Sequence, residues 1–167
     1  ERFLQLCAKE NLQVMNCTTP ANYFHALRRQ IHRDFRKPLV IMTPKSLLRN
    51  KLCVSNLEDF GSQNSFHRVL WDHATDPKEN SFIKLKERNK IRKVILCSGK
   101  VYFDLLEARE KLKKDDVVMY RIEQLYPFPI KSLVKELKIY AKNAKFYWCQ
   151  EEPKNMGAWF SVRDYIQ

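Results

Sequence analysis

The sequence predicts an α/β fold, a three-layer α-β-α arrangement with mostly parallel sheets. Three strand-like runs, Lys93–Ser98, Val117–Glu123 and Ala144–Gln150, are separated by two helical patterns. Two earlier runs, Leu12–Cys17 and Lys37–Thr43, also have a helical pattern between them. Strands that alternate with helices of this length form parallel sheets through crossover connections, so each set predicts one βαβ layer.

The run Val117–Phe128 is the one around which we expect the chain to be organised. It begins with β-forming apolar residues, becomes polar at Arg121, Glu123 and Gln124, and ends among prolines. This pattern is typical of a buried strand whose carboxyl end emerges into a polar crevice, where open α/β sheets bind their ligands. We therefore expect the function at the polar end of this run, in the middle of a β-α-β-α-β unit.

The first third of the chain predicts two helices and a helical turn around its two strands. Residues 1–11 place apolar side chains on one helical face. Thr19 followed by Pro20 supplies an N-cap and a proline at the first helical position, so a longer helix should begin there. Its apolar residues at helical spacing are Phe24, Leu27, Ile31 and Phe35. Pro44–Asn50 predicts one or two further helical turns.

The middle of the chain, from about Lys51 to Arg92, sustains no periodicity and is rich in polar residues. A segment of this length without a pattern usually connects two domains. We therefore expect one domain to end within residues 1–55, a linker over residues 56–91, and a second domain over residues 92–167.

Two helices of the second domain have an apolar stripe. The first follows the turn at Gly99 and is expected to turn inward Tyr102, Leu105, Leu106 and Leu112. The stripe of the second consists of Ile130, Leu133, Val134, Leu137 and Tyr140. One more helix is expected from Asn155 onward.

The chain is strongly basic, with 31 Lys and Arg against 19 Asp and Glu and a formal charge of +12. Such a charge suggests nucleic acid as one alternative partner. Much of the excess lies in one polar linker, whose basic residues are Lys84, Lys86, Arg88, Lys90, Arg92 and Lys93. A run like this is more often a solvated connection, and no aromatic stacking positions are interleaved with it, so we do not expect nucleic-acid binding.

The cysteines and the hydropathy place the chain inside a cell. There are five cysteines and no Cys-x-x-Cys pair, which is typical of reduced structural thiols. Neither a signal-like segment nor a long apolar span occurs, so we expect a soluble protein without a membrane segment. The chain begins and ends inside helical patterns without an initiator methionine, so we expect it to be a piece of a longer polypeptide.

Few local motifs indicate chemistry. Three glycines cannot supply a Walker loop or a Gly-x-Gly-x-x-Gly turn. Gly99 lies between a strand and a helix, where it forms either an anion-binding turn or a tight packing turn. Adjacent Glu151 and Glu152 diverge in direction, so we expect helix capping or an ion pair with Arg121 rather than a catalytic pair.

Two further groups of side chains are candidate binding sites. His25 and His32 lie on one helical face, but no third ligand recurs nearby, so we expect no metal site. Cationic side chains from both halves could converge on a phosphate-rich ligand at the domain junction; the alternative is that the first two only solubilise a helix. They are Arg28, Arg29, Lys100, Arg121 and Lys131.

Eight runs form one familiar set: Glu1–Cys7, Thr19–Ala21, Leu27–Gln30, Lys37–Leu39, Thr43–Arg49, Cys97–Tyr102, Arg121–Pro129 and Trp148–Pro153. In this order they closely resemble the thiamine-diphosphate-dependent, decarboxylating first component of the 2-oxoglutarate dehydrogenase complex. The resemblance covers nearly the whole chain outside roughly 54–90 and corresponds to the C-terminal portion of a much longer subunit.

The resemblance implies a fold, a reaction and partners. Residues 1–55 would be the end of a transketolase-like pyrimidine-binding domain, and residues 92–167 a truncated transketolase C-terminal-like domain. The full-length protein would oxidatively decarboxylate 2-oxoglutarate in the tricarboxylic acid cycle and transfer the succinyl group to a lipoyl group. It would act as a homodimer with the lipoyl-bearing succinyltransferase component, in the cytoplasm or, in a eukaryote, in the mitochondrial matrix; we expect the cytoplasm.

The same resemblance places the catalytic machinery outside this chain. The family residues that hold thiamine diphosphate and Mg²⁺ match no position here, so we expect no catalytic residue, cofactor ligand or metal ligand. The fragment alone is expected to be inactive and to serve in dimerisation and effector binding. The alternative is a stand-alone regulatory module that binds a nucleotide or an acyl-CoA without catalysis.

Some members of the resembling family bind an allosteric effector, acetyl-CoA or a nucleotide such as AMP, where the two domains meet. The aligned positions are Gln13, Arg29, Ser65, Arg68, Gln124, Lys131 and Ser132. Arg29, Gln124 and Lys131 keep cationic or amide groups suited to phosphate and carbonyl oxygens. The other four depart from the pattern of the acetyl-CoA-regulated members. We expect the effector site around Arg29, Gln124, Lys131, Arg68 and Gln13.

Overall fold

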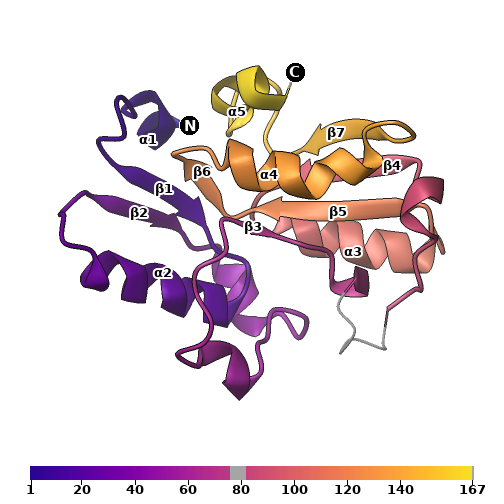
Figure 1. Ribbon diagram of the computed structural model, residues 1–167, viewed down its shortest axis with the longest axis horizontal. Helices are drawn as coiled ribbons and strands as arrows, with labels where there is room; N and C mark the ends of the chain where they lie inside the picture. The colour runs from indigo at the N-terminus through magenta and orange to yellow at the C-terminus, as the bar shows by residue number, and fades with distance from the viewer. Residues whose placement is uncertain (76–81, 167) are drawn as a thin grey trace.

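A computed structural model describes residues 1–75 and 82–166 and contains two sheets (Figure 1). The first sheet has the order β2 (Leu39–Met42), β1 (Gln13–Asn16), β6 (Gln124–Tyr126). The order of the second is β3 (Val69–Leu70), β5 (Val117–Ile122), β4 (Lys93–Cys97), β7 (Lys145–Cys149). The helices are α1 (Arg2–Gln5), α2 (Pro20–His32), α3 (Val101–Lys111), α4 (Ile130–Leu137) and α5 (Trp159–Ile166).

The parallel core of the second sheet confirms the predicted strands. β4 pairs in parallel with β5 on one side and β7 on the other, so that Lys93 lies beside both Val117 and Lys145. The run Val117–Phe128 thus supplies β5, the middle strand of the β-α-β-α-β unit along the chain, and in the sheet β5 and β4 are the two inner strands. β3 pairs antiparallel to β5, so the sheet is mixed.

Alternate residues of β4 and β5 face the two outer layers. One face contributes Val94, Leu96, Val118, Tyr120 and Ile122 to a core that includes Leu133 of α4. The opposite face contributes Cys97 and Met119 to a core with Tyr102, Phe103 and Leu106 of α3. Period-two alternation thus lets one sheet bury both helices, which confirms the three-layer arrangement.

The run Val117–Phe128 is divided between the two sheets. β5 ends at Ile122, β6 begins at Gln124, and β6 pairs antiparallel to β1. Glu123 lies between them, and its backbone carbonyl accepts from the amide of Asn16 at 2.8 Å. One stretch of chain therefore belongs to both layers, which sequence periodicity did not indicate.

Helix α2 begins as predicted but turns a different face inward. The Thr19 side chain accepts from the amide of Asn22 at 3.2 Å, which confirms the N-cap. The buried residues are Ala21, Asn22, His25 and Ala26, and the apolar row Phe24, Leu27, Ile31 and Phe35 is exposed. The polar residues can be buried because they have partners: the Asn22 amide bonds to Glu123, and His25 to the Asp59 carbonyl at 2.8 Å.

Other elements differ from expectation at their ends. α1 is one turn, and the helix cannot extend to residue 11 as expected, because Lys9 and Glu10 adopt φ angles of 47° and 56°. Leu112 is 63% exposed because α3 ends at the preceding residue, and Val134 of the α4 stripe is 55% exposed. The last helix begins at Trp159 rather than at Asn155.

Short 3₁₀ turns connect these elements. They are η1 (Lys45–Arg49), η2 (Leu57–Phe60), η3 (His73–Thr75), η4 (Arg88–Lys90) and η5 (Lys138–Tyr140), of which η1 confirms the predicted turn after the second strand. Across the described parts of the chain, no helix combines the length and the apolar character that crossing a bilayer requires.

Candidate anion-binding site at the junction of the sheets

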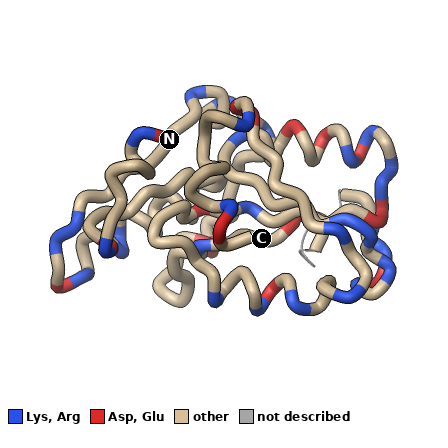
Figure 2. Tube along the Cα trace, turned by 90° about the horizontal axis from the view of Figure 1, so that it is seen from above, with Lys and Arg blue, Asp and Glu red and all other residues tan. Residues whose placement is uncertain are grey.

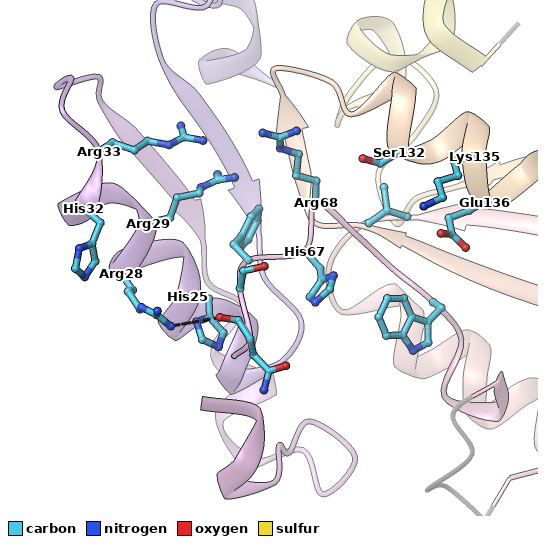
Figure 3. Close-up of a pocket in the computed structure, with 15 residues that line it drawn as sticks. His25, Arg28, Arg29, His32, Arg33, His67, Arg68, Ser132, Lys135 and Glu136 are labelled. Atoms are coloured by element: carbon cyan, nitrogen blue, oxygen red, sulfur yellow. Dashed lines mark hydrogen bonds between the residues drawn. The ribbon is translucent and has the colours of Figure 1, made fainter. Parts of the chain in front are cut away.

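A cavity of about 590 Å³ lies between α2, the segment 64–71 and α4 (Figure 3). Its cationic lining comes from all three, as Arg28, Arg29, Arg33, Arg68 and Lys135. A second cavity of about 410 Å³ shares Arg33, Arg68 and Ser132 with the first. We call the two together the junction cavity. Figure 3 shows the guanidinium groups of Arg29, Arg33 and Arg68 turned toward the same space.

Arg29 is held by amides from two neighbouring strands. Its Nη2 donates to Oε1 of Gln124 at 2.7 Å and to Oε1 of Gln13 at 3.1 Å. These amides lie close together because β6 pairs antiparallel to β1 with Gln124 beside Met15, and Gln13 and Met15 are alternate residues of β1 on the same face. The guanidinium carbon also lies 4.2 Å from the centroid of the Phe66 ring. Neutral amides and an aromatic face orient the cation without cancelling its charge.

Three guanidinium groups of the junction cavity have no counter-ion within the part of the chain that the structure describes. Nη1 of Arg33 donates to the same Gln13 oxygen at 3.1 Å, so one amide serves two cations. Burial, followed by Arg33 and Arg68, lowers the pKa of Arg29 to about 10. Burial and Arg68 also lower the pKa of Arg33. Over residues 1–75 and 82–166, no carboxylate forms an ion pair with any of the three. A bound anion would relieve this repulsion, so the arrangement favours phosphate or carboxylate ligands.

The residues expected at the effector site all line the junction cavity. Its first part is lined by Arg29 and Ser65, its second by Gln13, Gln124 and Lys131, and both by Arg68 and Ser132. Parts of the chain that are far apart in the sequence supply them. Two of these parts are joined directly, because the amides of Glu123 and Gln124 both donate to the Arg68 carbonyl, at 3.0 and 3.2 Å.

Three contributors were not singled out from the sequence. Arg33 lies one helical turn after Arg29, so its i,i+4 spacing was an available signal. Phe66 and Lys135 had no such signal, because their approach depends on how the segment 64–71 and α4 pack.

Two of the cations expected to converge lie elsewhere. Lys100 forms an ion pair with Glu151, so the pair expected between Glu151 and Arg121 was wrong. Arg121 is buried: it donates to the Thr18 hydroxyl at 3.2 Å and the Trp71 carbonyl at 2.9 Å, and stacks on Tyr102. The two have different neighbours because Lys100 starts α3 whereas Arg121 points inward from β5.

The remaining sequence candidates have structural roles. Gly99 has a φ of +78°, and a Cβ there would lie 2.3 Å from the side-chain nitrogen of Asn16. Gly99 therefore forms a tight packing turn, the second of the two alternatives that its place between a strand and a helix allowed. Within the described residues, no group of three or more His, Cys, Asp or Glu side chains could hold a metal ion.

A buried polar cluster adjoins the junction cavity. Glu123 is 0% exposed, and its carboxylate accepts from the Thr18 amide at 2.9 Å, the Thr18 hydroxyl at 2.5 Å and the Asn22 side chain at 2.9 Å. Burial raises the pKa of Glu123, against the lowering effects of Arg121 and of these donors. The cluster fixes the start of α2 to the connection between β5 and β6, and so sets the distance from Arg29 to Gln124.

Comparison with known proteins gives two family matches. The family described as 2-oxoglutarate dehydrogenase C-terminal matches residues 54–167, and the transketolase pyrimidine-binding domain matches residues 1–51. Proteins described as 2-oxoglutarate dehydrogenase E1 component from Brucella ovis, Brucella canis and Brucella suis are each 59% identical over 167 residues. That alignment covers 100% of this chain and 16% of each relative, so the chain spans about one sixth of their length.

Proposed function

Because this chain belongs to the 2-oxoglutarate dehydrogenase C-terminal family, we propose that it is the C-terminal region of the decarboxylating E1 component of a 2-oxoglutarate dehydrogenase complex. The observation that carries the proposal is 59% identity over 167 residues, the whole of this chain, to a protein described as 2-oxoglutarate dehydrogenase E1 component. The full-length protein would decarboxylate 2-oxoglutarate and pass the succinyl group to the lipoyl groups of a succinyltransferase partner. It would do so as a homodimer in the cytoplasm.

The chain itself would supply scaffold and ligand binding rather than catalysis. Thiamine diphosphate would act in the full-length protein as the carrier of the decarboxylated substrate, with Mg²⁺ at its diphosphate. The described residues do not fit thiamine diphosphate with Mg²⁺, since they contain no cluster of three or more His, Cys, Asp or Glu side chains that could hold a metal ion. The buried carboxylates Asp72 and Glu123 accept hydrogen bonds from donors within the chain. We assign residues 1–55 to the end of a pyrimidine-binding domain, 56–91 to a linker and 92–167 to the C-terminal domain.

An activity assay tests the proposed reaction. The full-length polypeptide that contains this chain should reduce an electron-accepting dye in the presence of 2-oxoglutarate, thiamine diphosphate and Mg²⁺. The isolated 167-residue chain should show no such activity under the same conditions. A full-length protein that oxidises other 2-oxo acids but not 2-oxoglutarate would contradict the proposed substrate. An active isolated chain would contradict the proposal that the catalytic residues lie outside it. A stand-alone regulatory module would be inactive in both forms.

For the junction cavity we propose binding of a phosphate-bearing effector, AMP or acetyl-CoA. Three cations that have no counter-ion among the described residues support this assignment: Arg29 and Arg33, which donate to amide oxygens of β1 and β6, and Arg68. Burial, followed by the charges of Arg33 and Arg68, lowers the pKa of Arg29, so a negative charge bound in this cavity would be stabilised. An effector seated there would contact both sheets at once, because Arg29 belongs to α2 whereas Lys131 and Ser132 belong to α4.

Arg68→Ala should weaken AMP binding by about tenfold to a hundredfold, since one charge-assisted contact contributes about 1.5–3 kcal/mol. Among the described residues, the Arg68 side chain forms no hydrogen bond, so the variant should fold normally. Isothermal titration with AMP and with acetyl-CoA would measure the change. Arg49→Ala, an exposed arginine of η1 that lines neither cavity, is the matched control. Equal weakening in both variants would exclude the junction cavity as the site.

A further inference from the structure

The amino ends of the parallel strands carry a second basic surface, separate from the junction cavity. Three segments meet there: residues 84–93 before β4, residues 111–116 before β5, and residues 138–145 before β7. Backbone bonds join them, from Lys86 to the Asp115 carbonyl at 2.8 Å and from Lys145 to the Arg92 carbonyl at 2.9 Å. A side-chain bond from Asn143 to the Asn89 carbonyl at 3.0 Å adds to these. We call this region the amino-edge surface.

Exposed cations crowd the amino-edge surface. They are Lys84, Lys86, Arg88, Lys90, Arg92, Lys93, Lys111, Lys113, Lys114, Lys138, Lys142 and Lys145. Strand register brings some of them together, since Lys93 and Lys145 are direct neighbours on paired strands, where like charges repel. Figure 2 shows the resulting concentration of Lys and Arg at one end of the molecule.

The acidic residues of these segments do not neutralise the surface. Glu87 pairs with Lys90, Asp115 with Lys86, and Asp116 with Arg92. Among the described residues, the other cations of the surface have no ion-pair partner. Such a one-sided patch raises the local concentration of oppositely charged partners and accelerates their binding.

We propose that the amino-edge surface docks an acidic segment of another protein. Its chemistry favours carboxylates over nucleic-acid phosphates. Only Arg88 and Arg92 among its cations are arginines, and Arg92 already pairs with Asp116. Bidentate phosphate recognition relies on arginine, whereas lysines act as point charges that suit scattered carboxylates.

The proposal does not depend on the effector role of the junction cavity. That cavity is lined by Gln13 at the start of β1 and Gln124 at the start of β6, and none of the amino-edge cations lines it. Loss of one binding activity should therefore leave the other intact.

Fluorescence anisotropy with labelled poly-L-glutamate tests the proposal. The chain should bind the polymer with an affinity that falls steeply as salt is added. The triple variant Lys84→Gln, Lys113→Gln and Lys142→Gln should bind about tenfold more weakly, because several exposed ion pairs each contribute a modest amount. All three side chains are exposed and form no ion pair with any residue in the described ranges 1–75 and 82–166, so the fold should be unaffected.

A matched triple variant separates this surface from net charge. Lys45→Gln, Lys51→Gln and Lys154→Gln remove the same charge from exposed positions outside the amino-edge surface and should change the affinity by less than about twofold. Equal losses in both variants would overturn the proposal. So would tighter binding of a DNA duplex of equal charge than of poly-L-glutamate, which would assign the surface to nucleic acid.

Discussion

Replacing Glu123 by alanine is expected to lower the free energy of unfolding by about 3–5 kcal/mol, because it strands a buried cation and several buried donors. The carboxylate is fully buried and accepts three hydrogen bonds, two from Thr18 and one from Asn22. Arg121 lies nearby, and in the described part of the chain it has no other anion, since its hydrogen bonds go to a hydroxyl and a carbonyl. Burying Glu123 is costly in itself, as its raised pKa indicates, yet removing it alone leaves its partners uncompensated.

Urea denaturation followed by circular dichroism would measure the effect of Glu123→Ala. A chain of this size should also lose about 10 °C in Tm. Glu107→Ala is the matched control, because Glu107 is an exposed residue on α3 and should change stability by less than about 0.5 kcal/mol. A loss below about 1 kcal/mol for Glu123→Ala would show that the cluster does not hold the two layers together.

The second large effect is expected for Arg109→Ala, at about 3–5 kcal/mol. Arg109 and Asp72 form an ion pair in which the side chains are 3% and 0% exposed. Asp72 also accepts from the amide of Met119 at 2.9 Å and from that of Ala74 at 3.0 Å. Without Arg109 the carboxylate would remain buried beside β5. The segment that carries Arg68 into the junction cavity would then lose its anchor.

A pair of comparisons distinguishes this ion pair from an ordinary surface contact. Arg163→Ala breaks the exposed pair with Asp164 and should cost less than about 0.5 kcal/mol. The double variant Arg109→Ala with Asp72→Ala should recover part of the loss, because no buried charge is then left alone. Urea unfolding of the three variants gives the coupling energy. Strict additivity of the two single losses would contradict the pairing.

Local signals predicted the elements better than they predicted how those elements pack. The N-cap at Thr19 and the apolar runs of β4, β5 and β7 depend on neighbouring residues, and the structure has them in place. The inward face of α2 depends on Asp59 and Glu123, which lie 34 and 101 residues away from their partners on the helix. Hydrophobic spacing therefore indicated Phe24 and Ile31, which are exposed, instead of Asn22 and His25.

The site divides in the same way. The resemblance predicted that Arg29 and Gln124 belong to one site. Their hydrogen bond is possible because β6, which carries Gln124, pairs with β1. Phe66 reaches Arg29 only because the Arg68 backbone is bonded to the chain beyond β5. No pattern within a short window of sequence encodes that contact.

The passage of one strand from the second sheet into the first limits how the two layers can move. A hinge needs a few backbone positions that are free to rotate. Here the connection through Glu123 is bonded on both sides, to Asn16 through its carbonyl and to Arg68 through its amide. Relative movement of the two sheets must therefore be a twist distributed along the chain from β5 to β6. A ligand bound beside Gln124 would contact the segment about which this twist occurs.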